Sequence, residues 1–204
     1  MSQDPTSHRR LILASQSKIR RELLSNAGID FETMTSHVDE VAAKNAMRSD
    51  GVSLSDQAVI LAEMKALRIS QTMQGIVIGA DQILDLDGKG FDKPSTRHEA
   101  KERLLELSGR SHYLQTAVVG CIEGRVVWKH LVRPRLTMRR LTAQFIDDFV
   151  EAEGDDILAS VGAYQVEKTG IHLFERIEGD YFSILGLPLL PLLAWLREIG
   201  AVRT

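Results

Sequence analysis

The sequence contains only one cysteine, Cys121, among 204 residues. A single thiol excludes an internal disulfide framework and is typical of a protein from a reducing cytoplasm. Because Cys121 lies in an apolar, strand-like stretch, we expect a buried small residue rather than a catalytic nucleophile. Only four apolar residues, Leu11–Ala14, follow the polar N-terminus, too few for a signal peptide, so we predict a flexible tail over 1–10 and a cytoplasmic protein.

Long apolar runs and a large net charge are also missing. The longest apolar stretch, Ile184–Leu196, is interrupted by Pro188 and Pro191 and is shorter than the roughly 20 residues of a membrane span. The formal net charge is only −3, and aromatic residues make up 5% of the chain. These values argue against a nucleic-acid-binding surface. We therefore expect no nucleic acid and no membrane among the partners.

Several common catalytic motifs are absent. The chain has no G-x-x-x-x-G-K-[ST] loop, no G-x-G-x-x-G turn and no G-x-S-x-G elbow, which excludes the P-loop, the Rossmann fingerprint and the usual serine-hydrolase nucleophile. It also has no His/Cys cluster with zinc spacing. His112, at the start of a predicted strand, is more typical of a structural histidine than of a catalyst.

The most informative segment is an apolar run that reaches an acid. Ile76–Ile78 is followed by Gly79, Ala80 and Asp81, which predicts a carboxylate at the carboxyl end of a buried strand, where α/β proteins bind ligands. The alternative is a turn or capping aspartate. Asp39 and Glu40 follow a second predicted strand, Ile29–Met34, and could instead belong to a solvated loop.

Together these acids suit metal or general-base chemistry. Carboxylates from two loops could hold an ion such as Mg²⁺, which prefers oxygen ligands and leaves room for substrate phosphates. One carboxylate could instead activate water as a general base.

Phosphate-binding candidates surround the first predicted turn. A strand over 11–14, a polar turn over 15–17 and a helix over 18–27 that Gly28 ends would direct backbone N–H groups at an anion. Arg20 lies just inside that helix and could join the turn in binding phosphate. Lys93 is held extended by the following proline. Lys65 and Arg21, like the other two, could instead be solvated surface charges.

The remaining pattern alternates helices and strands without a linker, so we predict one α/β domain over 11–204. The expected elements are a helix over about 58–70 capped by Ser55, a hairpin over 83–91, helices starting at Thr96 and Thr142, long strands over 113–122 and 126–138, a strand over 171–177 and a closing helix over 188–199.

Several segments together resemble one protein family. In order along the chain they are Leu11–Ser17, Arg20–Leu24, Ile78–Gln82, Lys93–Pro94, Leu107–His112, Gly162–Tyr164 and Glu178–Pro188. The combination resembles the Maf-like nucleoside triphosphate pyrophosphatases, and the resemblance covers about 11–197.

The resemblance implies an α/β fold similar to the inosine triphosphatase group, with an elongated mixed sheet, flanking helices and a cleft between two lobes. It also implies hydrolysis of nucleoside triphosphates to the monophosphate and pyrophosphate with Mg²⁺ or Mn²⁺, and a homodimer. A nucleotide-binding regulator of septum formation with weak catalysis is the alternative. By carry-over, Asp81 is the proton acceptor and shares the metal with Glu40. The phosphate-binding set is then Ser15, Arg20, Lys65 and Lys93.

Three residues bear on the choice of base. Ile19 replaces an arginine of the common family motif, and the 7-methyl-GTP branch tends to carry tryptophan there. Gln82 and Glu167 stand where the pyrimidine-preferring branch has threonine and glutamine, and they resemble the 7-methyl-GTP branch. A carboxylate at Glu167 could accept hydrogen bonds from the N1–H and N2–H₂ groups of guanine. We therefore favour a purine or modified nucleotide, with a dTTP or UTP preference as the alternative.

Overall fold

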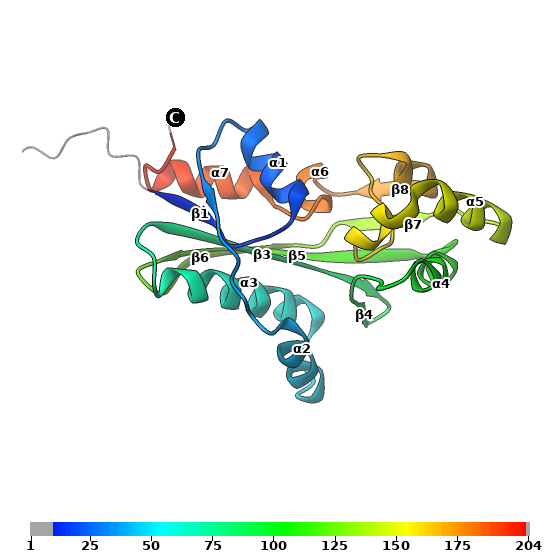
Figure 1. Cartoon of the computed structure of the whole chain (residues 1–204), viewed down its shortest axis with the longest axis horizontal. Helices are drawn as coiled ribbons and strands as arrows, with labels where there is room; N and C mark the ends of the chain where they lie inside the picture. Colours follow the sequence, from blue (N-terminus) through cyan, green and yellow to red (C-terminus); the bar gives the residue numbers. More distant parts are fainter. Residues whose placement is uncertain (1–9, 203–204) are drawn as a thin grey trace, which may run out of the picture.

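The structure is a computed structural model that describes residues 10–202 (Figure 1). An eight-stranded mixed sheet runs in the order β2-β1-β3-β5-β7-β8, with β4 paired to β3 and β6 to β5. Its strands are β1 (Leu11–Leu13), β2 (Glu32–Thr33), β3 (Ile76–Leu86), β4 (Lys89–Phe91), β5 (Ser111–Ile122), β6 (Arg125–Val132), β7 (Arg135–Met138) and β8 (Phe174–Glu178). The helices are α1 (Lys18–Asn26), α2 (Glu40–Ser49), α3 (Leu54–Ser70), α4 (Arg97–Leu107), α5 (Ala143–Glu153), α6 (Tyr181–Ile184) and α7 (Leu189–Glu198). The predicted α/β class is confirmed.

The helices are divided between two faces and one end of the sheet. In Figure 1, α1, α6 and α7 lie above the sheet and α3 lies below it, while α4 and α5 lie at the far end with β7 and β8. Successive β3 side chains point to opposite faces. Ile78 therefore packs in an apolar cluster with α1 and α7, and Val77 packs in another with α3. Leu86 belongs to a third cluster at the far end.

The predicted end of the strand at Asp81 is wrong. β3 continues through Asp81 to Leu86, because β5 pairs with it from Ile76 to Asp85. Gly79 makes no turn there. A Cβ at Gly79 would lie 2.1 Å from the carbonyl oxygen of Ala62, so the glycine serves the close approach of α3. The strand that ends at this level is β1, whose last residue pairs with Ile78.

A second correction concerns the acidic pair. Asp39 and Glu40 do not lie in a loop, as both the metal-site prediction and its alternative assumed: Asp39 caps α2 by accepting from the N–H of Ala42, and Glu40 is the first residue of that helix. Sequence inspection missed α2 because only Met47 of its ten residues is buried, which leaves a weak apolar periodicity.

Other boundaries were shifted or divided. Ser53, not Ser55, caps α3. The predicted strand over 126–138 is two strands, β6 and β7, separated at Pro134, which has no N–H to donate to a ladder. Part of the predicted strand over 171–177 is the 3₁₀-helix η2 (Thr169–Leu173). The helix starts at Thr96 and Thr142 are confirmed, since both side chains accept from backbone N–H groups of the first turn.

The N-terminal prediction falls mainly outside the described residues. Residues 1–9 are not described, and Arg10 already joins the sheet, since its carbonyl accepts from the N–H of Ile76 at 2.8 Å. Across residues 10–202, no helix is both long and apolar enough to cross a bilayer.

Cys121 is fully buried on β5, and burial raises the pKa of its thiol to about 11. A thiol with this pKa stays protonated at neutral pH and is a poor nucleophile. The expectation of a buried small residue is confirmed.

His112 is a buried structural residue. Its side chain is fully buried at the far end of the sheet, where Nε2 lies 2.7 Å from the hydroxyl oxygen of Tyr164. Burial lowers the pKa of His112 to about 4. The imidazole is therefore neutral in the folded protein at neutral pH, as expected for a structural histidine.

The lowered pKa makes stability depend on pH. In the unfolded chain His112 titrates near its ordinary pKa of about 6.5, so its contribution is complete above that pH and is lost as pH falls towards 4. Wild type should lose about 2 kcal/mol between pH 7.5 and 5 from this group. Urea unfolding of His112→Asn should lack that component, while the exposed control His98→Asn keeps it. Equal pH dependence in all three proteins would contradict this assignment.

Candidate active site

Arg20 joins three segments at the end of β1. Ser17 caps α1 by accepting from the N–H of Arg20, which places the guanidinium over the turn after β1. Its Nε donates to the carbonyl of Gly186 at 2.8 Å, and Nη1 donates to the carbonyl of Ala80 at 2.7 Å and to Oγ of Ser15 at 3.3 Å. Burial lowers the pKa of Arg20, against the attraction of two nearby carboxylates.

Lys65 joins the two acids from the other face of the sheet. It lies on α3 and is only 8% exposed. Its Nζ donates to Oδ1 of Asp81 at 2.6 Å and pairs with Oε1 of Glu40 at 2.9 Å. Asp81 is 5% exposed, and within residues 10–202 its second oxygen, Oδ2, is buried without a hydrogen-bond partner. An unsatisfied buried carboxylate oxygen is costly and is typical of a functional group.

Lys93 lies close enough to these charged side chains to interact electrostatically with each of them. It follows β4 and keeps an exposed surface, and partial loss of hydration is the main cause of its lowered pKa. The positive charges of Arg20 and Lys65 lower it further, while Glu40 and Asp81 oppose them. The predicted cations and carboxylates are therefore brought together beside the end of β1.

The acids could hold a metal only with help from the substrate. Among residues 10–202, no group of three or more His, Cys, Asp or Glu side chains could form a metal site. Asp81 and Glu40 supply two carboxylates, and the unpartnered Oδ2 is a suitable ligand. Mg²⁺ is commonly held by one or two carboxylates together with substrate phosphates and waters, so these residues fit that ion.

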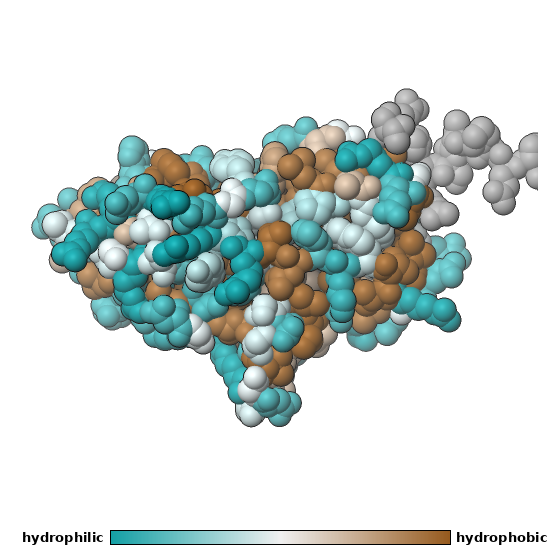
Figure 2. Space-filling view, turned by 180° about the vertical axis from the view of Figure 1, so that it is seen from behind, coloured by the Kyte–Doolittle hydropathy of each residue, from teal (hydrophilic) through white to brown (hydrophobic). Residues whose placement is uncertain are grey.

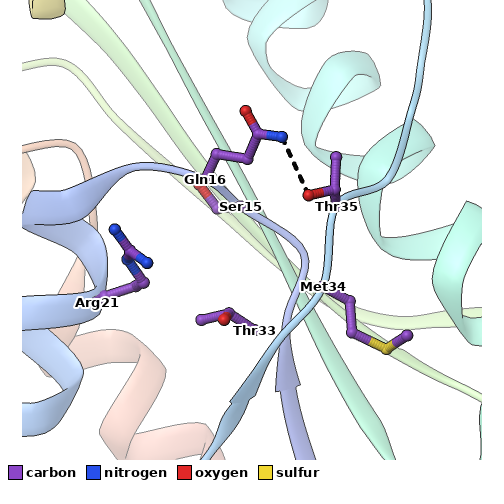
Figure 3. A pocket seen from close by; sticks show the side chains of 6 residues that line it. All are labelled: Ser15, Gln16, Arg21, Thr33, Met34 and Thr35. Carbon is purple, nitrogen blue, oxygen red and sulfur yellow. Dashed lines mark hydrogen bonds between the residues drawn. The ribbon is translucent and has the colours of Figure 1, made fainter.

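A small hollow adjoins this group through Ser15. Its volume is about 120 Å³, and it is lined by Ser15, Gln16, Arg21, Thr33, Met34 and Thr35 (Figure 3). The amide of Gln16 donates to Oγ1 of Thr35 at 3.0 Å across its rim. The hollow extends the polar surface next to Arg20.

Comparison with known proteins identifies the family. The profile described as "Maf-like protein" matches residues 10–199. The chain belongs to the Maf-like family. A Hyphomonas neptunium protein named nucleoside triphosphate pyrophosphatase is 53% identical over 91% of this chain and 93% of its own length. A Mesorhizobium japonicum protein named 7-methyl-GTP pyrophosphatase is 48% identical over 95% and 98%.

The residues expected to read the base lie on three different segments of this Maf-like protein. Gln82 points to the face opposite Asp81, where its amide nitrogen lies 2.9 Å from Oγ1 of Thr116 and 3.1 Å from the carbonyls of Ser183 and Ile184. Gln82 thus holds the end of α6, two residues before Gly186, whose carbonyl accepts from Arg20.

The other two base-reading candidates lie on other segments of the fold. Ile19 is half-buried on α1, and Glu167 is exposed just before η2. The hydrogen-bond partners of the Gln82 side chain among the described residues are Thr116, Ser183 and Ile184.

Sequence inspection missed the backbone partners of this Maf-like site. The carbonyls of Ala80 and Gly186 hold Arg20, and neither carries a side-chain signal. At Gly186 the backbone φ is +97°, in the region that favours glycine. That preference was the one clue available from the sequence.

Proposed function

We propose that this Maf-like protein hydrolyses nucleoside triphosphates to the monophosphate and pyrophosphate. The observation that carries the proposal is the buried, unpartnered Oδ2 of Asp81 beside Lys65, with Lys93 and Arg20 in the same field. A carboxylate that can accept a proton, surrounded by cations, suits attack of water on a polyanionic substrate. The names of the close relatives support the same reaction.

Each residue then has a defined task. Lys65, Lys93 and Arg20 stabilise the negative charge of the phosphates, with Ser15 at the turn. Asp81 and Glu40 would hold Mg²⁺ or Mn²⁺, which neutralises phosphate charge when bound. Lys65 holds Oδ1 of Asp81 and leaves Oδ2 free either to accept a proton from the attacking water or to ligate the metal. That water attacks the α-phosphorus, the α–β anhydride bond breaks and pyrophosphate leaves.

We further propose a purine or modified nucleotide such as 7-methyl-GTP as the preferred substrate. A carboxylate at Glu167 can accept from guanine N–H groups and attracts a cationic methylated ring. Relatives from Mesorhizobium japonicum and Rhizobium meliloti, each 48% identical, are named 7-methyl-GTP pyrophosphatases. The cytoplasmic location remains a prediction from the single cysteine and the N-terminal sequence, and the homodimer remains a prediction from the family resemblance.

A nucleotide panel tests this proposal. Wild-type protein is assayed with 7-methyl-GTP, GTP, dTTP and UTP in Mg²⁺ and in Mn²⁺, and products are followed by ³¹P NMR. We expect pyrophosphate rather than orthophosphate, and at least about tenfold higher kcat/KM for the preferred purine, the ratio that 1.4 kcal/mol of differential binding provides. A clear preference for dTTP would refute the base assignment. Tight binding without pyrophosphate release would favour a nucleotide-binding regulator.

A further inference from the structure

Asp92, the residue before Lys93, connects two parts of the candidate site. Its carboxylate accepts from Nζ of Lys44 at 2.6 Å through Oδ1 and from Nη2 of Arg48 at 2.8 Å through Oδ2. Lys44 and Arg48 are four residues apart on α2, so both lie on one helix face. Glu40, a further four residues towards the N-terminus, lies on the same side and contacts Lys65.

α2 has little apolar anchorage of its own. Only Met47 is buried, and Ala43 packs against the same cluster. In Figure 1 the helix projects from the body of the protein, and Figure 2 shows from behind that hydrophilic residues cover the tip of this projection. A helix with so few buried contacts opens easily, so polar contacts make a large share of what holds it.

The segment containing Asp92 is itself held from the far end of the sheet. Arg103, on α4, donates to the carbonyl of Asp92 at 2.9 Å and also to the carbonyl of Val161. Its guanidinium lies 4.3 Å from the ring centroid of Phe91. The backbone around Asp92 is therefore fixed to α4, while its carboxylate reaches α2.

We propose that Asp92 is a positioning residue that holds α2 against the Lys93 segment and thereby keeps Glu40 and Lys93 at their places around Asp81. The expected change in KM rests on the proposed function, whereas the expected hold of Asp92 on α2 does not. Asp92 makes no direct contact with Lys65 or Asp81, so its effect reaches the substrate only through the two segments that it joins.

Two features separate Asp92 from an ordinary surface ion pair. One carboxylate serves two cations on the same helix. The side chains of Asp92 and Arg48 are 49% and 44% exposed, but that of Lys44 is only 16% exposed, so water screens the Lys44 contact less than a surface pair. Asp87 is the matched control, because its Oδ2 accepts from Arg110 at 2.6 Å on the neighbouring hairpin without touching α2. Asp87 has a backbone φ of +52°, a region that asparagine also tolerates.

The test compares Asp92→Asn with Asp87→Asn in two measurements. Amide hydrogen exchange of residues 40–49, without substrate, should be about threefold to tenfold faster in Asp92→Asn and unchanged in Asp87→Asn. In pyrophosphate release, Asp92→Asn should raise KM about threefold to tenfold, with a smaller change in kcat. Asp92→Glu, which retains the charge, should restore part of the lost affinity.

A double-substitution cycle links the effect to Glu40. If Asp92 acts by placing α2, the KM increase caused by Asp92→Asn should shrink in the Glu40→Gln background. If amide hydrogen exchange of α2 is unchanged in Asp92→Asn, Asp92 does not hold α2, whatever the kinetics show. Faster exchange with unchanged KM would overturn the positioning role. A wild-type protein that releases no pyrophosphate would refute the proposed function, and the exchange result would still decide whether Asp92 holds α2.

Discussion

Asp81→Asn is expected to lower pyrophosphate release by about 10²- to 10⁴-fold while the protein stays folded. The amide cannot accept a proton from water, and it is a weaker metal ligand than a carboxylate. The fold should persist because the amide oxygen can still accept from Lys65, which also keeps its contact with Glu40. Initial rates with the preferred triphosphate, together with urea unfolding, measure both effects.

Asp85→Asn is the matched control for Asp81→Asn. Asp85 lies on the same strand and the same face of the sheet and is similarly buried, but it contacts the N–H of Gly88 and the amide of Gln115 instead of Lys65. The buried Oε1 of Gln115 has no partner within residues 10–202, so a flipped amide could accept from an asparagine at 85. Near-normal turnover of Asp81→Asn, or equal losses of activity in both variants, would contradict the catalytic role of Asp81.

Lys65→Met is expected to impair both stability and turnover. Methionine keeps the packing along α3, but it leaves the Asp81 carboxylate buried without its cation. Removing one partner of a buried pair costs about 3 kcal/mol or more, and losing a donor to the phosphates should lower kcat by about 10²-fold. Urea unfolding and initial rates measure the two losses separately.

Two further variants isolate the cause of the Lys65→Met effect. Lys129→Met removes an exposed lysine of β6 that pairs with Glu63 on α3, the helix that carries Lys65. This substitution should lower the free energy of unfolding by less than about 1 kcal/mol. The double variant Lys65→Met/Asp81→Asn should regain much of the lost stability without regaining activity, because the unpaired charge is gone. A Lys65→Met protein as stable as wild type would show that the buried pair contributes no net stability.

Local signals predicted much of the fold. Capping residues marked the helix starts at Thr96 and Thr142. Each threonine side chain accepts from the backbone N–H three residues later, and so short a contact can be recognised from the local sequence. The mistakes arose where distant contacts decide. Gly79 looked like a strand end, and its real role depends on the approach of Ala62 from α3. α2 went unnoticed because polar contacts with Asp92 and Lys65 hold much of it in place.

The candidate site shows the same division. The residue types that form it, among them Asp81 and Lys65, were named from the sequence and the family resemblance. The hydrogen bonds that these residues form could not be predicted in the same way. The guanidinium of Arg20 donates largely to backbone carbonyls from segments up to 166 residues away. Gln82 faces away from Asp81 because side chains alternate along β3. Neither fact follows from the identity of the residues.

The continuity of β3 has a consequence for how activity is acquired. This one strand supplies Ile78 to the cluster under α7, Ile83 to the cluster over α3 and Leu86 to the cluster at the far end. Asp81 lies between them, so a loss of packing in any one cluster is expected to disturb the strand that carries this carboxylate. We therefore expect pyrophosphate release to respond to core substitutions far from Asp81 as well as to changes in the site itself.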